Sequence, residues 1–171
     1  MSPRPRLLAL FAVAAVPLIL GVWVPRAVEI GLFLNLLIAA AALLDMLLTP
    51  TTRQIIVERE VGEVLSVGAE NPVVLRATNQ SRYPLVVELT DETPQPGQTR
   101  ELPVKLALAP WKDHAATYHF QPQRRGRKEF AAIYLRYPSL LGLWNRMERR
   151  PLESSVRVYP DIRAVRRFDL L

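Results

Sequence analysis

Two histidines, His114 and His119, are the first candidates for chemistry, because an imidazole can bind a metal ion or transfer a proton. They lie five residues apart in one predicted strand. An odd separation puts two side chains on opposite faces of a strand, so this pair cannot share a metal ion. The chain has no cysteine, which excludes a thiolate site and a cysteine nucleophile. We therefore expect neither a metal nor another cofactor.

Three acidic residues, Asp91, Glu92 and Asp113, could form a carboxylate pair. Glycoside hydrolysis needs two carboxylates that converge in a cleft. Here the acids lie in or beside predicted loops, where we expect them to be solvated. The chain contains no G-x-S-x-G, P-loop or G-x-G-x-x-G motif. The sequence predicts that the protein is not an enzyme; a cryptic hydrolase is the alternative, and a deep pocket with converging acids would support it.

The sharpest charge cluster is the segment "RRGRK", whose cations are Arg124, Arg125, Arg127 and Lys128. The 171-residue chain has a net charge of +6 at pH 7, which favours anionic partners. A nucleic-acid patch would also need exposed aromatic residues, but Phe130, Ala132 and Tyr134 share one strand face that we expect to be buried. We therefore predict a β-turn with an unusual backbone angle at Gly126. Its four cations form a candidate docking patch for a partner or a membrane surface, and we expect no nucleic acid.

The first 48 residues read as a membrane segment. Leu7 to Val24 contains no charge, and Val28 to Leu48 has acids only near its ends. About 20 apolar residues in a helix cross about 30 Å of hydrocarbon, so residues 7–48 predict a two-helix transmembrane hairpin in a lipid bilayer. A signal peptide is the alternative for residues 1–24. It would have a shorter apolar core and an A-x-A cleavage site, which "WVPRAVE" lacks.

Basic residues near the ends of the two segments set the expected orientation. They lie before the first segment, after the second, and once in the turn: Arg4, Arg6, Arg53, Arg59 and Arg26. Because cytoplasmic flanks carry the excess of Lys and Arg, residues 1–6 form a cytoplasmic basic N-terminus. The chain after Leu48 is expected to face the cytoplasm as well.

Asn35 and Asp45 are the candidate polar contacts within the membrane segment. An amide near the bilayer centre usually finds a helix partner. For Asn35 we expect a hydrogen bond within the hairpin, and a contact with a second copy or a partner is the alternative. Asp45 is expected to lean toward the interface, toward Arg53; a role in a proton relay is its alternative.

Residues 53–160 read as an immunoglobulin-like β-sandwich, because short alternating segments follow one another at intervals of about ten residues. The predicted strands are Arg53–Glu60, Pro72–Asn79, Pro84–Glu92, Leu102–Ala109, His114–Gln121, Lys128–Tyr137 and Ser154–Pro160. The loop "SLLGLW" leads into the last strand, and Trp144 is expected to plug one end of the sandwich. Residues 161–171 read as the start of a truncated helical or C-terminal segment.

Several of these segments together resemble a family of bacterial membrane proteins known as domain of unknown function number 58. The carrying motifs are "VVLRATNQSRYPLVVELTDETP" (Val73–Pro94), the Arg124–Gly126 turn, "YPSLLGLW" and "VYPDI" (Val158–Ile162). Family members continue into a domain resembling von Willebrand factor A, whose signature is not found in this sequence.

The resemblance implies a function as well as a fold. It implies a non-catalytic scaffold in the bacterial inner membrane that works with a MoxR-type AAA ATPase, and with a transglutaminase-like membrane protein, in a chaperone-like or cell-envelope system. The alternative is an extracytoplasmic adhesion or envelope module, which needs the opposite topology.

Overall fold

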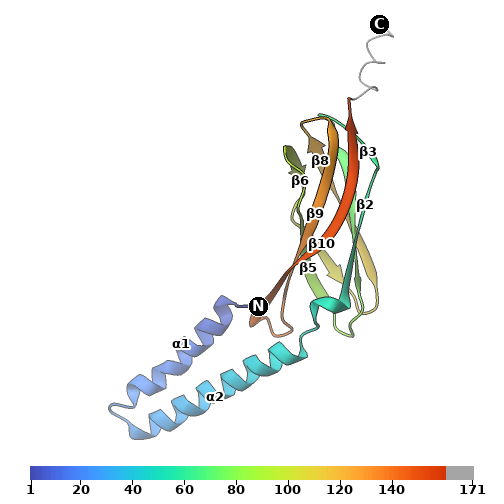
Figure 1. Ribbon diagram of the computed structural model, residues 1–171. Coiled ribbons are helices and arrows are strands. Elements are labelled where there is room, and N and C mark those ends of the chain that lie inside the picture. Colours follow the sequence, from blue (N-terminus) through green and yellow to red (C-terminus); the bar gives the residue numbers. More distant parts are fainter. Residues whose placement is uncertain (161–171) are drawn as a thin grey trace. The chain divides into compact units, whose positions relative to one another are not determined.

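The computed structural model describes residues 1–160, and these form two compact units (Figure 1). The first unit consists of Met1–Thr51 together with Tyr137–Met147. The second consists of Thr52–Arg136 and the chain from Glu148 onward. The segment predicted for residues 161–171 lies outside the described residues.

Two antiparallel helices make up most of the first unit: α1 (Pro5–Leu20) and α2 (Pro25–Leu48). Each begins with a proline, whose fixed φ angle and missing N–H suit the first helical turn. The helices approach closely at Gly31, where an added Cβ would lie 2.5 Å from a side-chain carbon of Leu18. Glycine at this position therefore permits the packing of the hairpin.

Within residues 1–160, one helix, α2, is by length and composition apolar enough to cross a membrane. It is contained in the stretch Pro25–Gln54, whose most apolar window has a mean hydropathy of 2.2 and is only 11% buried. A membrane anchor and a signal sequence share these properties. Helix α1 has 16 residues and so spans about 24 Å at 1.5 Å per residue, less than the 18-residue segment predicted. It ends early because a turn begins at Gly21.

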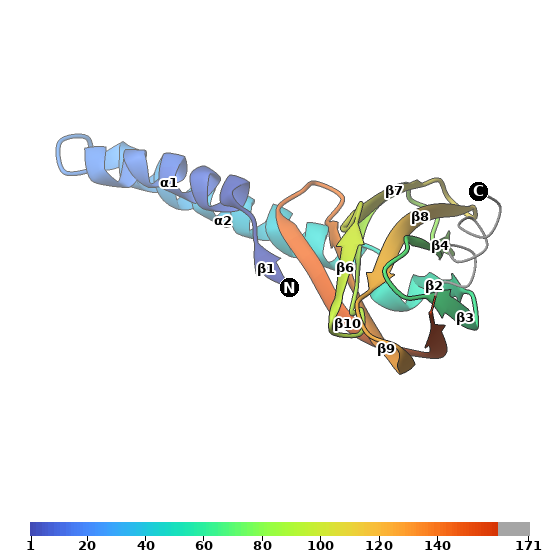
Figure 2. The same cartoon turned by 90° about the horizontal axis from the view of Figure 1, so that it is seen from above.

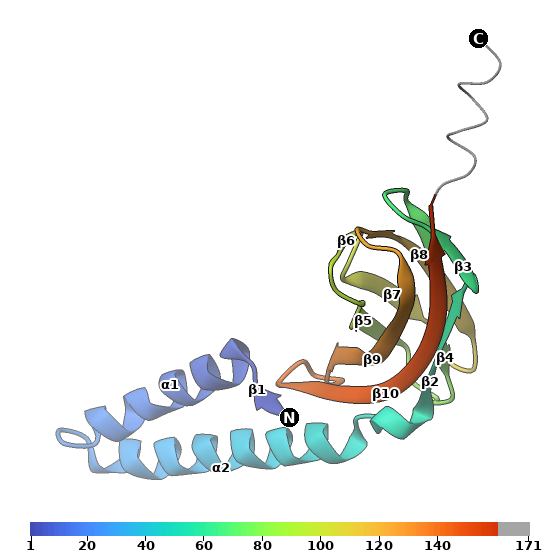
Figure 3. The ribbon, with the colours of Figure 1, turned by 45° about the horizontal axis from the view of Figure 1, so that its top comes forward.

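The second unit is a β-sandwich of two sheets, which Figures 2 and 3 show from two further directions. After the short helix η1 (Thr52–Gln54), one sheet has the order β2–β4–β8–β6 and the other β10–β9–β5–β7, with β3 beside the end of β10. The strands are β2 (Ile55–Val61), β3 (Val64–Ser66), β4 (Asn71–Asn79), β5 (Leu85–Asp91), β6 (Gly97–Arg100), β7 (Val104–Leu108), β8 (Asp113–Pro122), β9 (Gly126–Pro138) and β10 (Trp144–Tyr159).

The predicted fold class, two helices followed by an immunoglobulin-like sandwich, is confirmed. Alternate residues of β2, β4, β5 and β7 are buried, as a sheet with one face on the core requires. Side chains expected to point inward do so: Ile55, Val57, Val104, Leu106, Leu108, Tyr118 and Phe120.

Among β2 to β10, the largest departures from the predicted strands are β3, β6 and the start of β10. Strands β3 and β6 were not predicted, because they have only three and four residues. Strand β10 begins at Trp144 instead of Ser154. Before Val156, the half-buried positions of β10 include Glu148 and Arg150. This part of the strand therefore alternates between half-buried and exposed residues, but not between apolar and polar ones.

The face predicted for Tyr134 is wrong. Phe130 and Ala132 are buried, but Tyr134 is 44% exposed, and burial resumes at Ile133 and Leu135. Glu92 of the neighbouring chain segment hydrogen-bonds two successive residues of β9: its N–H donates to Ala132, and its carbonyl accepts from Ala131. An extra residue of this kind reverses the inside–outside alternation of a strand.

Candidate functional site

The predicted basic turn forms between β8 and β9. Gly126 begins β9 with a φ of 117°, a backbone conformation that favours glycine, as expected. Arg124 and Arg125 are exposed in the turn. Arg127 bonds Ser155 Oγ at 2.9 Å, and Lys128 donates to the Gln95 carbonyl at 2.9 Å. The four predicted cations therefore lie at one end of the sandwich, but Arg127 and Lys128 are consecutive in β9 and point to opposite faces of the strand.

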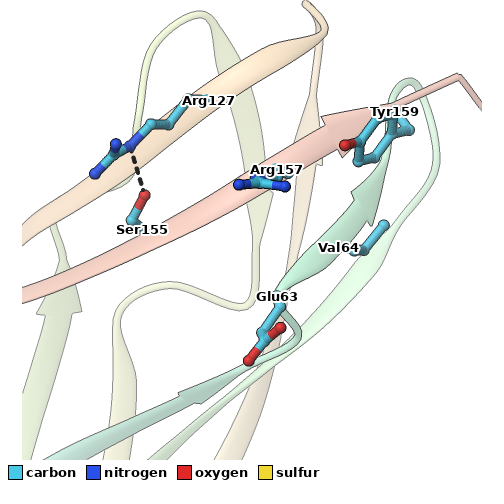
Figure 4. A pocket seen from close by; sticks show the side chains of 6 residues that line it. All are labelled: Glu63, Val64, Arg127, Ser155, Arg157 and Tyr159. Atoms are coloured by element: carbon cyan, nitrogen blue, oxygen red, sulfur yellow. Dashed lines mark hydrogen bonds between the residues drawn. The ribbon is translucent and has the colours of Figure 1, made fainter.

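A groove runs from this turn along β9, β10 and β3. Two adjoining hollows of about 500 and 480 Å³ share Arg127, Arg157 and Tyr159 as lining residues. In Figure 4, Arg127 and Arg157 lie on neighbouring strands, with Tyr159 and Val64 toward one end. We call this surface, lined by Glu63, Val64, Arg125, Gly126, Arg127, Ser155, Arg157, Val158, Tyr159 and Pro160, the β10 groove.

The β10 groove has the composition of a docking site for an anionic segment. Three arginines line it against one carboxylate, Glu63. In residues 1–160, Arg127 pairs with Glu129 at 3.3 Å, whereas Arg157 has no ion pair. A planar guanidinium can bind a carboxylate or phosphate through two parallel hydrogen bonds. The exposed side chains of Val64 and Tyr159 add apolar surface beside the arginines.

Two residues of the β10 groove, Arg157 and Tyr159, are not predicted as site residues from the sequence. Both lie in "VRVY", where they alternate with the buried Val156 and Val158. This alternation predicts that both point outward, but only the pairing of β10 with β9 and β3 brings them beside Arg127.

An ion pair lies inside the sandwich, and it too is not predicted from the sequence. Arg59 and Asp91 contact each other through two hydrogen bonds, one of them 2.8 Å long, and neither side chain is exposed. The Tyr118 hydroxyl donates to the same carboxylate at 2.6 Å. The guanidinium lies 5.0 Å from the centre of the Phe130 ring and donates to the Leu152 carbonyl. The expectation that Asp91 is solvated is therefore wrong.

This ion pair joins the two sheets. Arg59 and Tyr118 come from β2 and β8, whereas Asp91 comes from β5. A buried charge needs a partner and satisfied hydrogen bonds, and this one has both. The enclosed pair thus connects β2 and β8 to β5, and through the Leu152 carbonyl to β10.

Tyr118 should make folding sensitive to alkaline pH. Burial, followed by the Asp91 carboxylate, raises the pKa of its hydroxyl above the ordinary value of 10.0. The folded chain keeps this proton while the unfolded chain loses it above about pH 10. The contribution is therefore fully present below about pH 10 and falls by about 1.4 kcal/mol per pH unit above it.

Urea titrations at about pH 9 and about pH 11 measure this loss. Tyr118→Phe should show a shallower pH dependence than the unaltered chain, since the variant has no hydroxyl to titrate. Tyr159→Phe, which alters an exposed tyrosine, is the matched control. Equal slopes for the unaltered chain and Tyr118→Phe would show that the buried hydroxyl is not responsible.

The polar residues of the first unit make internal contacts. Asn35 Nδ2 donates to the Ala14 carbonyl of α1 at 3.0 Å and to the Gly31 carbonyl at 2.8 Å. This is the bond within the hairpin that the sequence favoured.

Asp45 does not lean toward Arg53, contrary to the sequence expectation. Its buried carboxylate accepts hydrogen bonds from the Ser139 hydroxyl, from Leu141 N–H at 2.8 Å and from Leu143 N–H at 3.2 Å. The carboxylate thus fixes the loop of the "PSLLGLW" element to α2, and a proton relay is not needed to explain its presence.

Contrary to the sequence expectation, Trp144 does not plug one end of the sandwich. Its indole N–H donates to the Ala42 carbonyl of α2 at 2.9 Å. It packs on an apolar cluster formed by Leu7, Ala42 and Leu143. Strand β1 (Ser2–Pro3) pairs antiparallel with the start of β10, Trp144 and Asn145, in the same unit.

The histidines do not form a site together. His119 Nδ1 lies 3.0 Å from Glu101 Oε2, and His114 is exposed. This contact lowers the pKa of the Glu101 carboxyl. Within residues 1–160, no group of three His, Cys, Asp or Glu side chains is placed to hold a metal ion.

Comparisons with known proteins find similar solved structures for the sandwich, but no similar sequence family. No family model and no curated protein matches the chain. Among solved structures, native alpha-2-macroglobulin from Escherichia coli, spanning domain MG7 to the C-terminus, is similar with a TM-score of 0.51 and 16% identity. The match covers 66% of this chain and 17% of that one, so the chain corresponds to a small part of the larger protein.

Two smaller proteins give weaker matches over most of their own length. A FixG-related protein from Vibrio parahaemolyticus has a TM-score of 0.42 and 8% identity, covering 61% of this chain and 96% of that one. The CARDB domain of a Pyrococcus furiosus protein, in complex with di-metal ions, has a TM-score of 0.42 and 12% identity, covering 66% and 90%. At these identities the likeness concerns the fold alone.

Proposed function

We propose that the protein is a membrane-anchored interaction module, in which the helical unit holds a non-catalytic sandwich at the membrane. The exposure of apolar side chains on α2 carries this proposal. Leu32, Phe33, Leu36 and Leu47 are each at least 59% exposed. Water disfavours apolar surface by about 25 cal/mol per Å², so a helix of this kind needs lipid or protein around it.

The short turn between the helices supports a hairpin that crosses the bilayer. Trp23 is 74% exposed there, beside Val22 and Val24, and tryptophan is enriched at membrane interfaces. The Arg and Lys distribution favours a cytoplasmic sandwich. A contribution of α1 to the span requires tilt or local thinning of the bilayer, because α1 is short.

The β10 groove is the proposed docking surface on the sandwich. Its arginines fit an extended acidic segment of a protein partner, and Tyr159 offers a surface for an apolar side chain next to it. The resemblance described above suggests the class of partner: a MoxR-type AAA ATPase, together with a transglutaminase-like membrane protein. The function would then be to present this ATPase at the inner membrane of a bacterium.

An extracytoplasmic adhesion or envelope module is the alternative function. The immunoglobulin-like fold suits it equally well, because such sandwiches serve many unrelated functions. The two proposals differ in the side of the membrane on which the sandwich lies.

Charge reversal in the β10 groove tests the docking surface. Arg127→Glu with Arg157→Glu should weaken binding of an acidic partner at least tenfold, because two exposed charge contacts of about 1 kcal/mol each are lost and replaced by repulsion. Binding to a purified MoxR-type ATPase can be measured by biolayer interferometry on chain reconstituted in nanodiscs.

Arg100→Glu is the matched control for these variants. Arg100 is an exposed arginine of β6 that pairs with Glu70, outside the groove. Reversal of this charge should leave binding within about twofold of the unaltered chain. If the groove variant binds as well as the control, the partner docks elsewhere.

A further inference from the structure

A cluster of aromatic and basic residues, exposed except for the half-buried Tyr83, lies at the end of the sandwich opposite the basic turn. Its members come from η1 and from the loops β4–β5 and β7–β8: Arg53, Arg82, Tyr83, Trp111 and Lys112. We call it the Trp111 cluster. Strand β8 begins at Asp113, next to this cluster, and ends at Pro122, next to the basic turn. Ten strand residues at about 3.3 Å each separate the two surfaces by about 30 Å.

Hydrogen bonds bring these three chain segments together. Gln80 N–H donates to the Gln54 carbonyl at 2.7 Å, and Asn79 N–H donates to the Lys112 carbonyl at 2.9 Å. The Asn79 side-chain amide, which is fully buried, donates to Tyr83 at 2.8 Å and to Ala109 at 3.2 Å. One asparagine therefore fixes both loops, so the side chains of the cluster are carried on a backbone held by hydrogen bonds.

The Trp111 side chain is exposed, and its backbone has an unusual conformation. It is 67% exposed and has a φ of 59°, a conformation that a bulky side chain rarely adopts. The Arg82 guanidinium lies 5.2 Å from the centre of the Tyr83 ring. In residues 1–160, Arg53, Arg82 and Lys112 have no ion pair with a carboxylate, and the adjacent Asp113 pairs with Arg76 at 2.9 Å.

The chain connects this end of the sandwich directly to α2. The helix ends at Leu48 and η1 begins at Thr52. Four residue steps reach at most about 14 Å, since an extended residue spans about 3.3–3.6 Å. Whatever the arrangement of the two units, the first residue of the sandwich therefore lies within this reach of the end of the helix.

We propose that the Trp111 cluster is a second membrane contact, which rests in the lipid head-group region on the side where α2 leaves the bilayer. Tryptophan and tyrosine favour this layer, and arginine and lysine near it are attracted by anionic lipids. The inference rests on the proposed anchoring by α2. It applies to either side of the membrane, so it does not depend on the orientation of the hairpin.

A depth measurement tests this contact, and the lack of native cysteine makes it specific. Ala109→Cys places a probe beside Trp111 at an exposed alanine, without removal of a cluster member. The full chain is labelled with an environment-sensitive fluorophore and reconstituted in vesicles of phosphatidylethanolamine and phosphatidylglycerol that carry head-group spin labels. Arg124→Cys, in the turn at the other end of β8, is the matched control.

We expect at least twofold stronger quenching at position 109 than at position 124. Trp111→Ala in the Ala109→Cys chain should reduce the quenching, and Trp111→Phe should preserve most of it. Phosphatidylcholine vesicles, which carry no net charge, should give weaker quenching at 109. Equal quenching at 109 and 124, or protection of 109 only when a protein partner is added, would overturn the proposal.

A third probe separates this proposal from the anchoring on which it rests. Leu36→Cys reports on α2 itself, where the side chain is 68% exposed. Quenching of this probe by lipids labelled in the acyl chain, with none at 109 by head-group labels, would leave the anchor intact and refute the contact. Absence of quenching at Leu36→Cys would refute the anchor, and the Trp111 contact with it.

Discussion

Replacement of Asp91 by asparagine should lower the free energy of unfolding of the sandwich by about 3–5 kcal/mol, the cost of removing one partner of a buried ion pair. Asp91→Asn keeps the shape of the side chain but leaves the Arg59 guanidinium charged, enclosed and without its carboxylate. The Tyr118 hydroxyl loses a charged acceptor as well. Urea denaturation of the full chain in detergent micelles, followed by circular dichroism of the β-sheet, measures the loss.

Glu92→Gln is the matched control, one residue further along the chain. Glu92 pairs with Arg149 at 2.9 Å, but its side chain is 40% exposed, and exposed pairs contribute only about 0–1 kcal/mol. The double variant Arg59→Met, Asp91→Leu should recover much of the stability lost in Asp91→Asn, because no unpaired charge then remains. A small effect of Asp91→Asn, similar to that of Glu92→Gln, would contradict a structural role of the pair.

Replacement of Asp45 by alanine should release the loop of residues 139–143 from α2. The carboxylate accepts three hydrogen bonds from this loop. Each buried donor left without a partner costs about 1–3 kcal/mol, so we expect a total of about 3–5 kcal/mol. Hydrogen exchange of the Leu141 and Leu143 amides, measured in detergent micelles, should become at least a hundredfold faster, since 1.4 kcal/mol corresponds to a factor of ten.

Two further variants check the specificity of this effect. Ser139→Ala removes one of the three donors and also the acceptor of the Trp144 N–H. The Leu141 and Leu143 amides keep their bonds to Asp45, so these two amides should stay largely protected. Glu29→Gln alters an exposed acid of the same helix and should have no effect on them. Unchanged exchange at Leu141 and Leu143 in Asp45→Ala would show that the loop is held by Trp144 and the apolar cluster alone.

The pattern of hydrophobic residues predicted most of the fold. Strands with alternating apolar residues, such as β4 and β7, were found at nearly their observed positions. The start of β10 was not found, because its inward positions are occupied by long polar side chains. Arg150 at one of them donates to the Ile55 and Thr52 carbonyls, which the sequence alone does not indicate.

The contacts between residues far apart in sequence explain the errors about individual side chains. Asp45 and Ser139 are 94 positions apart, and Arg59 and Asp91 are 32 apart. An isolated acid next to a predicted loop is normally solvated, so the sequence predicts that Asp91 faces solvent. Its burial follows from a partner on the opposite sheet, which can be recognised only when the sheets are placed on each other.

The sequence predicts only the part of the β10 groove that lies around Gly126, because the rest of the groove depends on contacts between residues far apart in sequence. The cations around Gly126 stand out because they are consecutive and mark a turn. Arg157 and Tyr159 are some 30 residues further on and become part of the site through strand pairing.

The most direct test of the central proposal, a membrane hairpin with a cytoplasmic sandwich, is a pair of reporter fusions in bacterial cells. One reporter pair, active either only inside or only outside the cytoplasm, is fused at Pro25, the first residue of α2 after the turn, and after Arg53. We expect the outside-active reporter to work at Pro25 and the inside-active reporter to work after Arg53. An outside-active signal after Arg53 would contradict the proposal and favour the extracytoplasmic module.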